Sequence, residues 1–198
     1  MDIPRLARPA WIFRGQPAQR GRVPAQAPPP RLVERDNEGG DFAAWAAGLQ
    51  HAEADAEHFV FVNDTARGPF VPRYAPSETS WPELFCCRID DRVKLVGASI
   101  NRMVNWEPRW RCPHIQTHAW ATDATGIALL QSAGVFSPEP DPQKRIAACD
   151  ALRNGLVVPG EDPAKIAYVF EHEIKASKVV AEAGFEIFGF QLAETTGS

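Results

Sequence analysis

Compact apolar runs alternate along the chain with longer stretches in which apolar residues recur every three or four positions. The compact runs are rich in β-branched and aromatic residues and predict strands at 31–35, 58–62, 93–100, 114–122 and 185–192. The longer stretches start near residues that cap helices and predict helices at 41–54, 80–89, 123–134, 141–153 and 162–183. This alternation predicts one α/β domain over residues 31–192, built on a mixed, mostly parallel, partly Rossmann-like sheet with flanking helices.

The two ends of the chain differ from this domain. Residues 1–30 hold seven prolines, five arginines and a single acidic residue. Because proline fixes φ and lacks a backbone N–H, this segment is expected to be a disordered tail, and residues 193–198 a second one. A glycine-containing turn at 37–40 then precedes Asp41, which is expected to cap the first long helix.

Charge and cysteine content narrow the class of protein. The 198 residues carry 21 basic and 25 acidic side chains, a net charge of −4, which disfavours general nucleic-acid binding. No apolar run approaches the roughly 20 residues of a membrane-spanning helix, so a cytoplasmic location is expected, with peripheral membrane association left open. Four cysteines without a C-x-x-C pair indicate buried free thiols in a reducing compartment.

The end of the strand at 58–62 is the first candidate site. Asn63 and Asp64 follow this strand directly, and the loop beyond them contains Arg67 and Gly68. Ligands of open α/β sheets bind outside the carboxyl ends of strands, where a carboxylate can hold Mg²⁺ or Mn²⁺ and an arginine can contact phosphate. The alternative is that Asp64 only caps a turn.

The helix predicted at 162–183 carries the second candidate. Polar side chains interrupt its apolar stripe, which reads Ile166, Phe170, Glu173, Ser177, Val180, Gly184. An inward-facing Glu173 can act as a general base, because burial raises the pKa of a carboxyl group. It can equally be an edge residue that pairs with a neighbouring cation or lines a wet cleft.

A third arrangement involves histidines. His114 and His118 lie on one face in a strand or a helix, and together with Glu173 they would make a metal triad of the kind used in hydrolysis. The H-E-x-x-H signature is absent, so a His/Glu metal-dependent hydrolase ranks below the other hypotheses.

Six segments in order resemble glycosyltransferases of the GT-A type, in particular the rhamnan-synthesis F-like proteins and related polysaccharide-synthesis glycosyltransferases. They are similar to the family patterns N-x-G-x-D-F-G-A-W/Y, F-L-N-D/S-S-V-R/Y-G-P-F, K-L-V-G-x-x-I-N, H-I/V-Q-S, A-T-D-x-x-G and E-x-x-x-S. In this chain they are residues 36–45, 61–70, 94–101, 114–117, 121–126 and 173–177. The resemblance covers roughly residues 35–192.

The resemblance implies transfer of a sugar from a nucleotide-sugar donor to a saccharide or other hydroxyl acceptor. Asp64 takes the place of the family's metal site for Mn²⁺ or Mg²⁺, and Glu173 takes the place of the base that activates the acceptor. The implied donor and substrate contacts are Asn37, Asp41, Asn63, Arg67, Gly68, His114, Gln116 and Ser177.

The chain also departs from the family. Residues 63–65 read Asn-Asp-Thr in place of a full D-x-D, and the proline-rich tail stands where the family has its first strand-helix-strand unit, which holds the nucleotide base. The alternative function is therefore a truncated, non-catalytic remnant that binds carbohydrate or a partner protein.

Overall fold

The computed structural model describes residues 33, 40–63, 66, 80–102, 113–137 and 168–193. These residues form five strands: β1 His58–Val62, β2 Val93–Asn101, β3 His114–Ile115, β4 Ala119–Asp123 and β5 Glu186–Ala193. They also form four α-helices: α1 Gly40–Leu49, α2 Trp81–Cys86, α3 Ala124–Ser132 and α6 Lys175–Glu182. A π-helical segment, η2 Val169–Ile174, leads directly into α6.

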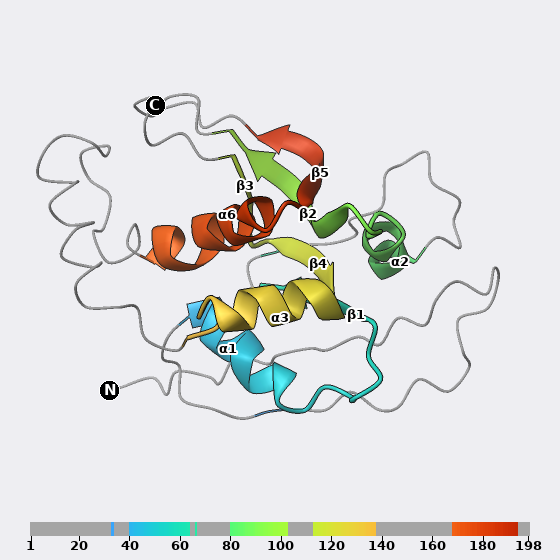
Figure 1. Cartoon of the computed structure of the whole chain (residues 1–198), viewed down its shortest axis with the longest axis vertical. Helices are drawn as coiled ribbons and strands as arrows, with labels where there is room; N and C mark the ends of the chain where they lie inside the picture. Colours follow the sequence, from blue (N-terminus) through green and yellow to red (C-terminus); the bar gives the residue numbers. More distant parts are fainter. Residues whose placement is uncertain are drawn as a thin grey trace, which may run out of the picture.

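Alternation along β1 explains how the sheet is covered on both faces. Phe59 and Phe61 belong to the larger core with α1, α3 and α6, whereas Val60 points the other way and packs with Phe85 of α2. Both sets are buried, which is why this strand reads as a continuous apolar run. Figure 1 shows α1, α3 and α6 on one face and α2 apart from them.

The expected mostly parallel sheet is wrong. β4 pairs antiparallel with β1 and with β2, and β3 pairs antiparallel with β2; only the β2–β5 pair is parallel. The physical reason lies in the requirement for a crossover: a parallel neighbour needs a connecting helix, and the sequence predicts none between residues 101 and 113, so an antiparallel β2–β3 pair agrees with the pattern better than a parallel one. The helix predicted between β1 and β2 suggested that these two strands pair in parallel, but β1 pairs with β4 and not with β2.

β3 and β4 are two parts of one interrupted strand beside β2. Ile115 pairs with Ile100, and further along Trp120 pairs with Gly97. Two residues of β2, at 98 and 99, therefore lie opposite four residues, at 116–119, so this edge carries two extra residues. The sequence predicted an unbroken strand at 114–122. Such insertions bend a strand and redirect its side chains, and they are frequent beside active sites.

Other predictions have mixed outcomes. Helix α1 begins at Gly40, so Asp41 lies in its first turn and is not its N-cap, and the helix ends at Leu49 instead of 54.

The prediction that the cysteines are buried is wrong for Cys87, which is exposed; Cys86 is half-buried, and both thiols are free. No helix in the described ranges is long and apolar enough to cross a membrane.

Several predictions fall outside the described residues. These are the tail at 1–30, the helix at 141–153, the start of the helix at 162, the residues of the strand at 31–35 other than Val33, residues 194–198 of the C-terminal tail, Cys112 and Cys149.

Candidate functional site

The interrupted strand is attached to helix α6 by a buried hydrogen bond. The backbone N–H of Ile115 donates to the hydroxyl oxygen of Ser177 at 2.9 Å. Both residues are buried, Ser177 to 1% exposure. A buried N–H needs such a partner, so Ser177 fixes where β3 lies against the helix.

Glu173, one helical turn before Ser177, contacts Thr117, which lies within the interruption, and His114, which starts β3. One carboxylate oxygen, Oε2, accepts from the hydroxyl of Thr117 at 2.8 Å and from its backbone N–H at 3.4 Å. The other, Oε1, lies 3.2 Å from Nε2 of His114. The Glu173 side chain is 14% exposed and the His114 side chain 2%. Glu173 therefore faces inward, as the apolar stripe predicts, and it has polar neighbours on both oxygens.

The π-helical segment brings a second set of side chains to the same helix. A π-helix closes its hydrogen bonds over five residues, is rare, and often occurs at functional sites. Tyr168 and His172 contact each other here, with ring centroids 4.6 Å apart. Both rings also contact Phe42 of α1, at 6.0 Å and 5.0 Å. Sequence reasoning missed this segment, because residues four apart share a face whether the helix is α or π.

Tyr168 connects the start of α1 to the Glu173 region. The backbone N–H of Phe42 donates to the Tyr168 hydroxyl oxygen at 3.0 Å, so the tyrosine satisfies the helix terminus that Asp41 was expected to cap. Gly40 has φ +61°, and a Cβ there would lie 2.7 Å from that hydroxyl oxygen. Burial, together with the nearby carboxylates of Asp41 and Glu173, raises the pKa of Tyr168 to about 12.

His172 is a buried neutral base next to this contact. Its Nδ1 lies 2.7 Å from the carbonyl oxygen of Val135; a carbonyl only accepts, so Nδ1 carries the proton. Burial lowers the pKa of His172, which keeps the ring uncharged near neutral pH. Nε2 has no hydrogen-bond partner among the described residues.

Gln116 and Asn63 connect the interruption between β3 and β4 to β2 and to the end of β1. Ser99 of β2 donates from its hydroxyl to Oε1 of Gln116 at 2.8 Å. The backbone N–H of Asn63 donates to the His118 carbonyl oxygen at 3.2 Å, which extends the β1–β4 pairing to the extra residues. Asn63 Oδ1 accepts from the N–H of Ala66 at 2.9 Å. The capping bond in the described part of this turn thus comes from Asn63.

The structure brings together five of the predicted site residues, Glu173, Ser177, His114, Gln116 and Asn63, around the interrupted strand. Asp41 lies at the start of α1, near Tyr168. The remaining four, Asn37, Asp64, Arg67 and Gly68, fall outside the described residues. Thr117 and Tyr168 were not predicted; the E-x-x-x-S spacing alone did not reveal their contacts.

The metal triad expected for a hydrolase is not formed. His118 is exposed, and the described ranges contain no group of three His, Cys, Asp or Glu side chains arranged to hold a metal ion. Of the two other members of the expected triad, His114 contacts only Glu173.

No protein family model, no curated protein and no solved structure matches this chain.

Proposed function

We propose that this chain is a glycosyltransferase-like domain that transfers a sugar from a nucleotide-sugar donor to a hydroxyl acceptor, with Glu173 as the general base. The observation that carries the proposal is the position of the Glu173 carboxylate. It is held by His114 and Thr117 where the strand beside β2 is interrupted, and it keeps 14% of its side chain exposed.

This arrangement suits proton abstraction. A base must be fixed within hydrogen-bond reach of the hydroxyl that it deprotonates. Each carboxylate oxygen offers about two acceptor positions, so the contacts with Thr117 and His114 leave room for a substrate hydroxyl. These two neighbours fix the orientation of the carboxylate before substrate binds, which avoids reorganisation during the reaction.

The proposed step is a displacement at the anomeric carbon of the donor sugar. The acceptor hydroxyl gives its proton to Glu173 and its oxygen bonds to the anomeric carbon. The bond from that carbon to the donor diphosphate breaks, and its electron pair leaves with the diphosphate. The proton ends on Glu173 and the charge on the diphosphate, so atoms and electrons balance.

The donor side is proposed at the end of β1, which reaches the interruption through Asn63 and His118. A divalent cation at Asp64 would neutralise charge on the leaving diphosphate. The described residues alone do not build that cation site, because the amide oxygen of Asn63 already accepts from Ala66 and no three-ligand group is present in the described ranges. No step above therefore depends on the cation.

A second candidate is a non-catalytic domain that binds carbohydrate or a partner protein. The observation that favours it is that both oxygens of Glu173 already have protein neighbours. In that case Glu173 only clamps the interrupted strand onto the helix.

Calorimetric titration of the full chain with UDP-, GDP- and dTDP-sugars, with and without Mn²⁺, separates the two candidates. Sugar transfer predicts that one donor binds, that Mn²⁺ strengthens binding, and that Asp64→Asn removes the Mn²⁺ effect while the fold stays intact. Saccharide binding without any donor binding would support the second candidate and overturn the first.

A further inference from the structure

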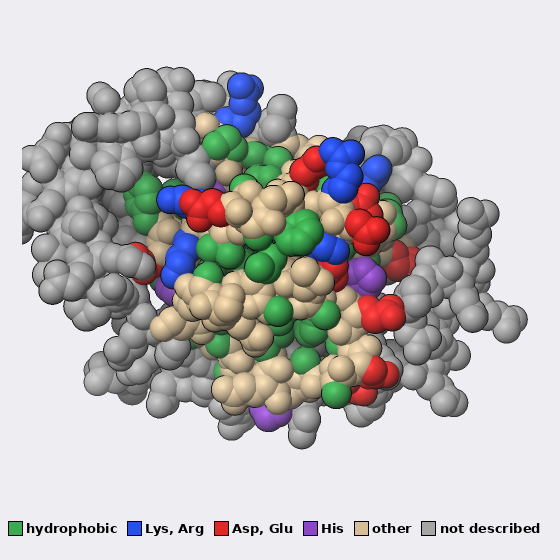
Figure 2. All heavy atoms as spheres, viewed as in Figure 1, with side chains coloured by type: hydrophobic (Ala, Val, Ile, Leu, Met, Phe, Trp, Pro, Cys, Tyr) green, Lys and Arg blue, Asp and Glu red, His purple; other side chains and the backbone are tan. Residues whose placement is uncertain are grey.

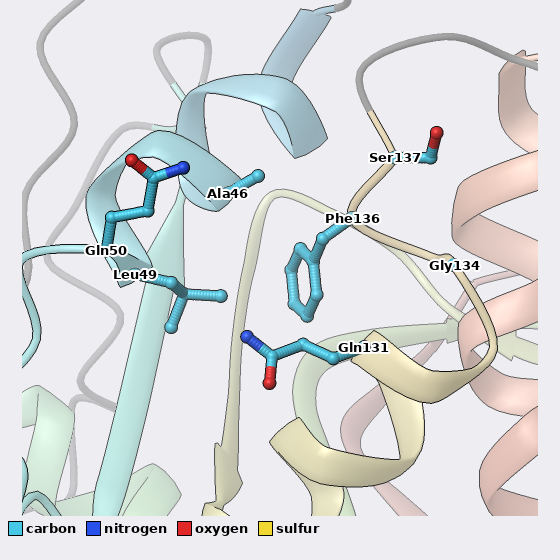
Figure 3. Close-up of a pocket in the computed structure, with 7 residues that line it drawn as sticks. All are labelled: Ala46, Leu49, Gln50, Gln131, Gly134, Phe136 and Ser137. Atoms are coloured by element: carbon cyan, nitrogen blue, oxygen red, sulfur yellow. The ribbon is translucent and has the colours of Figure 1, made fainter.

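A pocket between the C-terminal ends of α1 and α3 is a separate candidate binding site. It has a volume of about 370 Å³ and opens to solvent. Figure 3 shows the ring of Phe136 facing Leu49 and Ala46 of α1, with the side chain of Gln131 below them and that of Gln50 on the α1 side. None of its lining residues belongs to the site around Glu173.

The chain reversal after α3 builds one wall of the pocket. Gly134 has φ +69°, a conformation that favours glycine, and it turns the chain back beneath the helix. The N–H of Val135 then donates to the carbonyl oxygen of Leu130 at 2.9 Å. Phe136 is 7% exposed and packs against Phe61 in the core, with ring centroids 5.7 Å apart. The aromatic wall is therefore rigid and formed in advance of any ligand.

Part of the pocket lining is apolar, and the rest is polar but uncharged. Ala46, Leu49 and Phe136 supply the apolar part, whereas Gln50, Gln131 and Ser137 supply two carboxamides and a hydroxyl. A carboxamide both donates and accepts hydrogen bonds. Over α1 and α3, Figure 2 shows mainly hydrophobic side chains and the tan of backbone and other side chains, with acidic side chains toward the right-hand edge.

These features select a ligand class. A pyranose ring has an apolar C–H face that can lie against Ala46, Leu49 and the exposed edge of Phe136, and its hydroxyls both donate and accept hydrogen bonds. The volume lies at the low end of the range for small-molecule pockets, which suits one sugar ring. Phosphate and carboxylate ligands call for cationic partners, and no charged side chain lines the pocket in the described ranges. Near this turn, Lys175 has its Nζ 4.0 Å from where a Cβ on Gly134 would be, but Lys175 does not line the pocket.

We propose that the pocket between α1 and α3 binds one uncharged pyranose unit of a saccharide, through the apolar lining of Ala46, Leu49 and Phe136 and the carboxamides of Gln50 and Gln131. This inference does not depend on sugar transfer, because a domain without transfer activity can hold the same pocket. The pocket also adjoins the Glu173 helix through the contact between Val135 and His172.

Two-dimensional NMR titration of the full chain with the methyl glycosides of glucose, galactose and mannose, up to about 50 mM, tests the proposal. At least one glycoside should shift signals of residues around Gln131. The variants Ala46→Phe, which fills the pocket, and Gln50→Ala/Gln131→Ala, which removes the carboxamides, should each weaken binding by about tenfold or more. The matched control is Ser132→Ala on the same helix, which should bind as the parent does.

Three results would overturn the proposal: no glycoside binds; binding is unchanged in both pocket variants; or glucuronate binds as tightly as glucose. Excess UDP should leave glycoside binding at this pocket unchanged. Since the Glu173→Gln variant should also keep it, failure of sugar transfer and failure of this proposal can be told apart.

Discussion

The hydroxyl oxygen of Ser177 and the backbone nitrogen of Ile115 lie 2.9 Å apart, buried between helix α6 and the short strand β3. They are 62 residues apart in the chain, and one turn earlier on the same helix Glu173 contacts His114 and Thr117. The helix therefore holds the interrupted strand at two successive points, one buried and one partly open to solvent.

Ser177→Ala should destabilise the protein by about 1–3 kcal/mol, because it leaves the buried N–H of Ile115 without its partner. Urea unfolding followed by tryptophan fluorescence measures this. The control is Ser132→Ala, an exposed serine at the end of α3, which should change the free energy of unfolding by less than about 0.5 kcal/mol. Equal values for the two variants would show that Ser177 does not hold β3.

The ion pair between Lys94 and Asp123, near the start of β2, should stabilise the protein. Its atoms are 2.7 Å apart with side chains 9% and 18% exposed, and Asp123 also caps α3 by accepting from Gly126. Lys94→Met removes the ion pair and the cation–π contact with Phe185 but keeps the cap, whereas Asp123→Ala removes the pair and the cap. Asp123→Ala should therefore cost more, by about 1 kcal/mol.

The control for this ion pair is Lys178→Met, on the exposed pair with Glu182, where the cost should be under about 0.5 kcal/mol. Thermal unfolding of the three variants gives the order. A Lys94→Met protein as stable as the Lys178→Met protein would show that the pair at Lys94 contributes nothing.

Stability should fall as the pH falls below the ordinary pKa of histidine. Burial lowers the pKa of folded His172 from 6.5, so the unfolded chain binds this proton more readily than the folded one. The stabilising effect is complete above about pH 6.5 and is lost as the pH falls toward the folded pKa, at up to about 1.4 kcal/mol per pH unit. The neighbouring charges of Glu171 and Lys175 act on the pKa in opposite directions.

Urea unfolding at several pH values between about 7.5 and 5.5 should show this slope in the parent protein. His172→Gln keeps a donor for the Val135 carbonyl but does not titrate, and it should flatten the slope. His118→Gln, at an exposed position, should leave the slope as it is. An unchanged slope in His172→Gln would contradict the prediction.

Local pattern was enough to predict β1 and the start of α3. The run HFVFV alternates between two buried faces, and its bounds were predicted as observed. Asp123 caps α3 through a residue three positions away, which is a local contact. In both cases the deciding contacts are either short-range or repeat with the period of the strand.

Strand direction and the details of the site depend on contacts that sequence patterns do not encode. The break between β3 and β4 is fixed by Glu173 and Ser177, more than 50 residues later. The terminus of α1 is satisfied by Tyr168, 126 residues from Phe42, and not by the nearby Asp41. The stripe of apolar residues located Glu173 on the inward face, but its partners emerged only from tertiary structure.

Glu173→Gln tests the central claim most directly, because it keeps the side-chain volume and an acceptor for Thr117 while removing the base. Transfer rate and thermal midpoint should be measured on the same sample, with the donor identified by calorimetry. Glu182→Gln, exposed on the same helix, serves as the control. We predict that Glu173→Gln stays folded and loses transfer by roughly 10²–10⁴-fold, the usual contribution of general base catalysis, while Glu182→Gln keeps the parent rate. A folded Glu173→Gln protein with an unchanged transfer rate would contradict the assignment of Glu173 as the base.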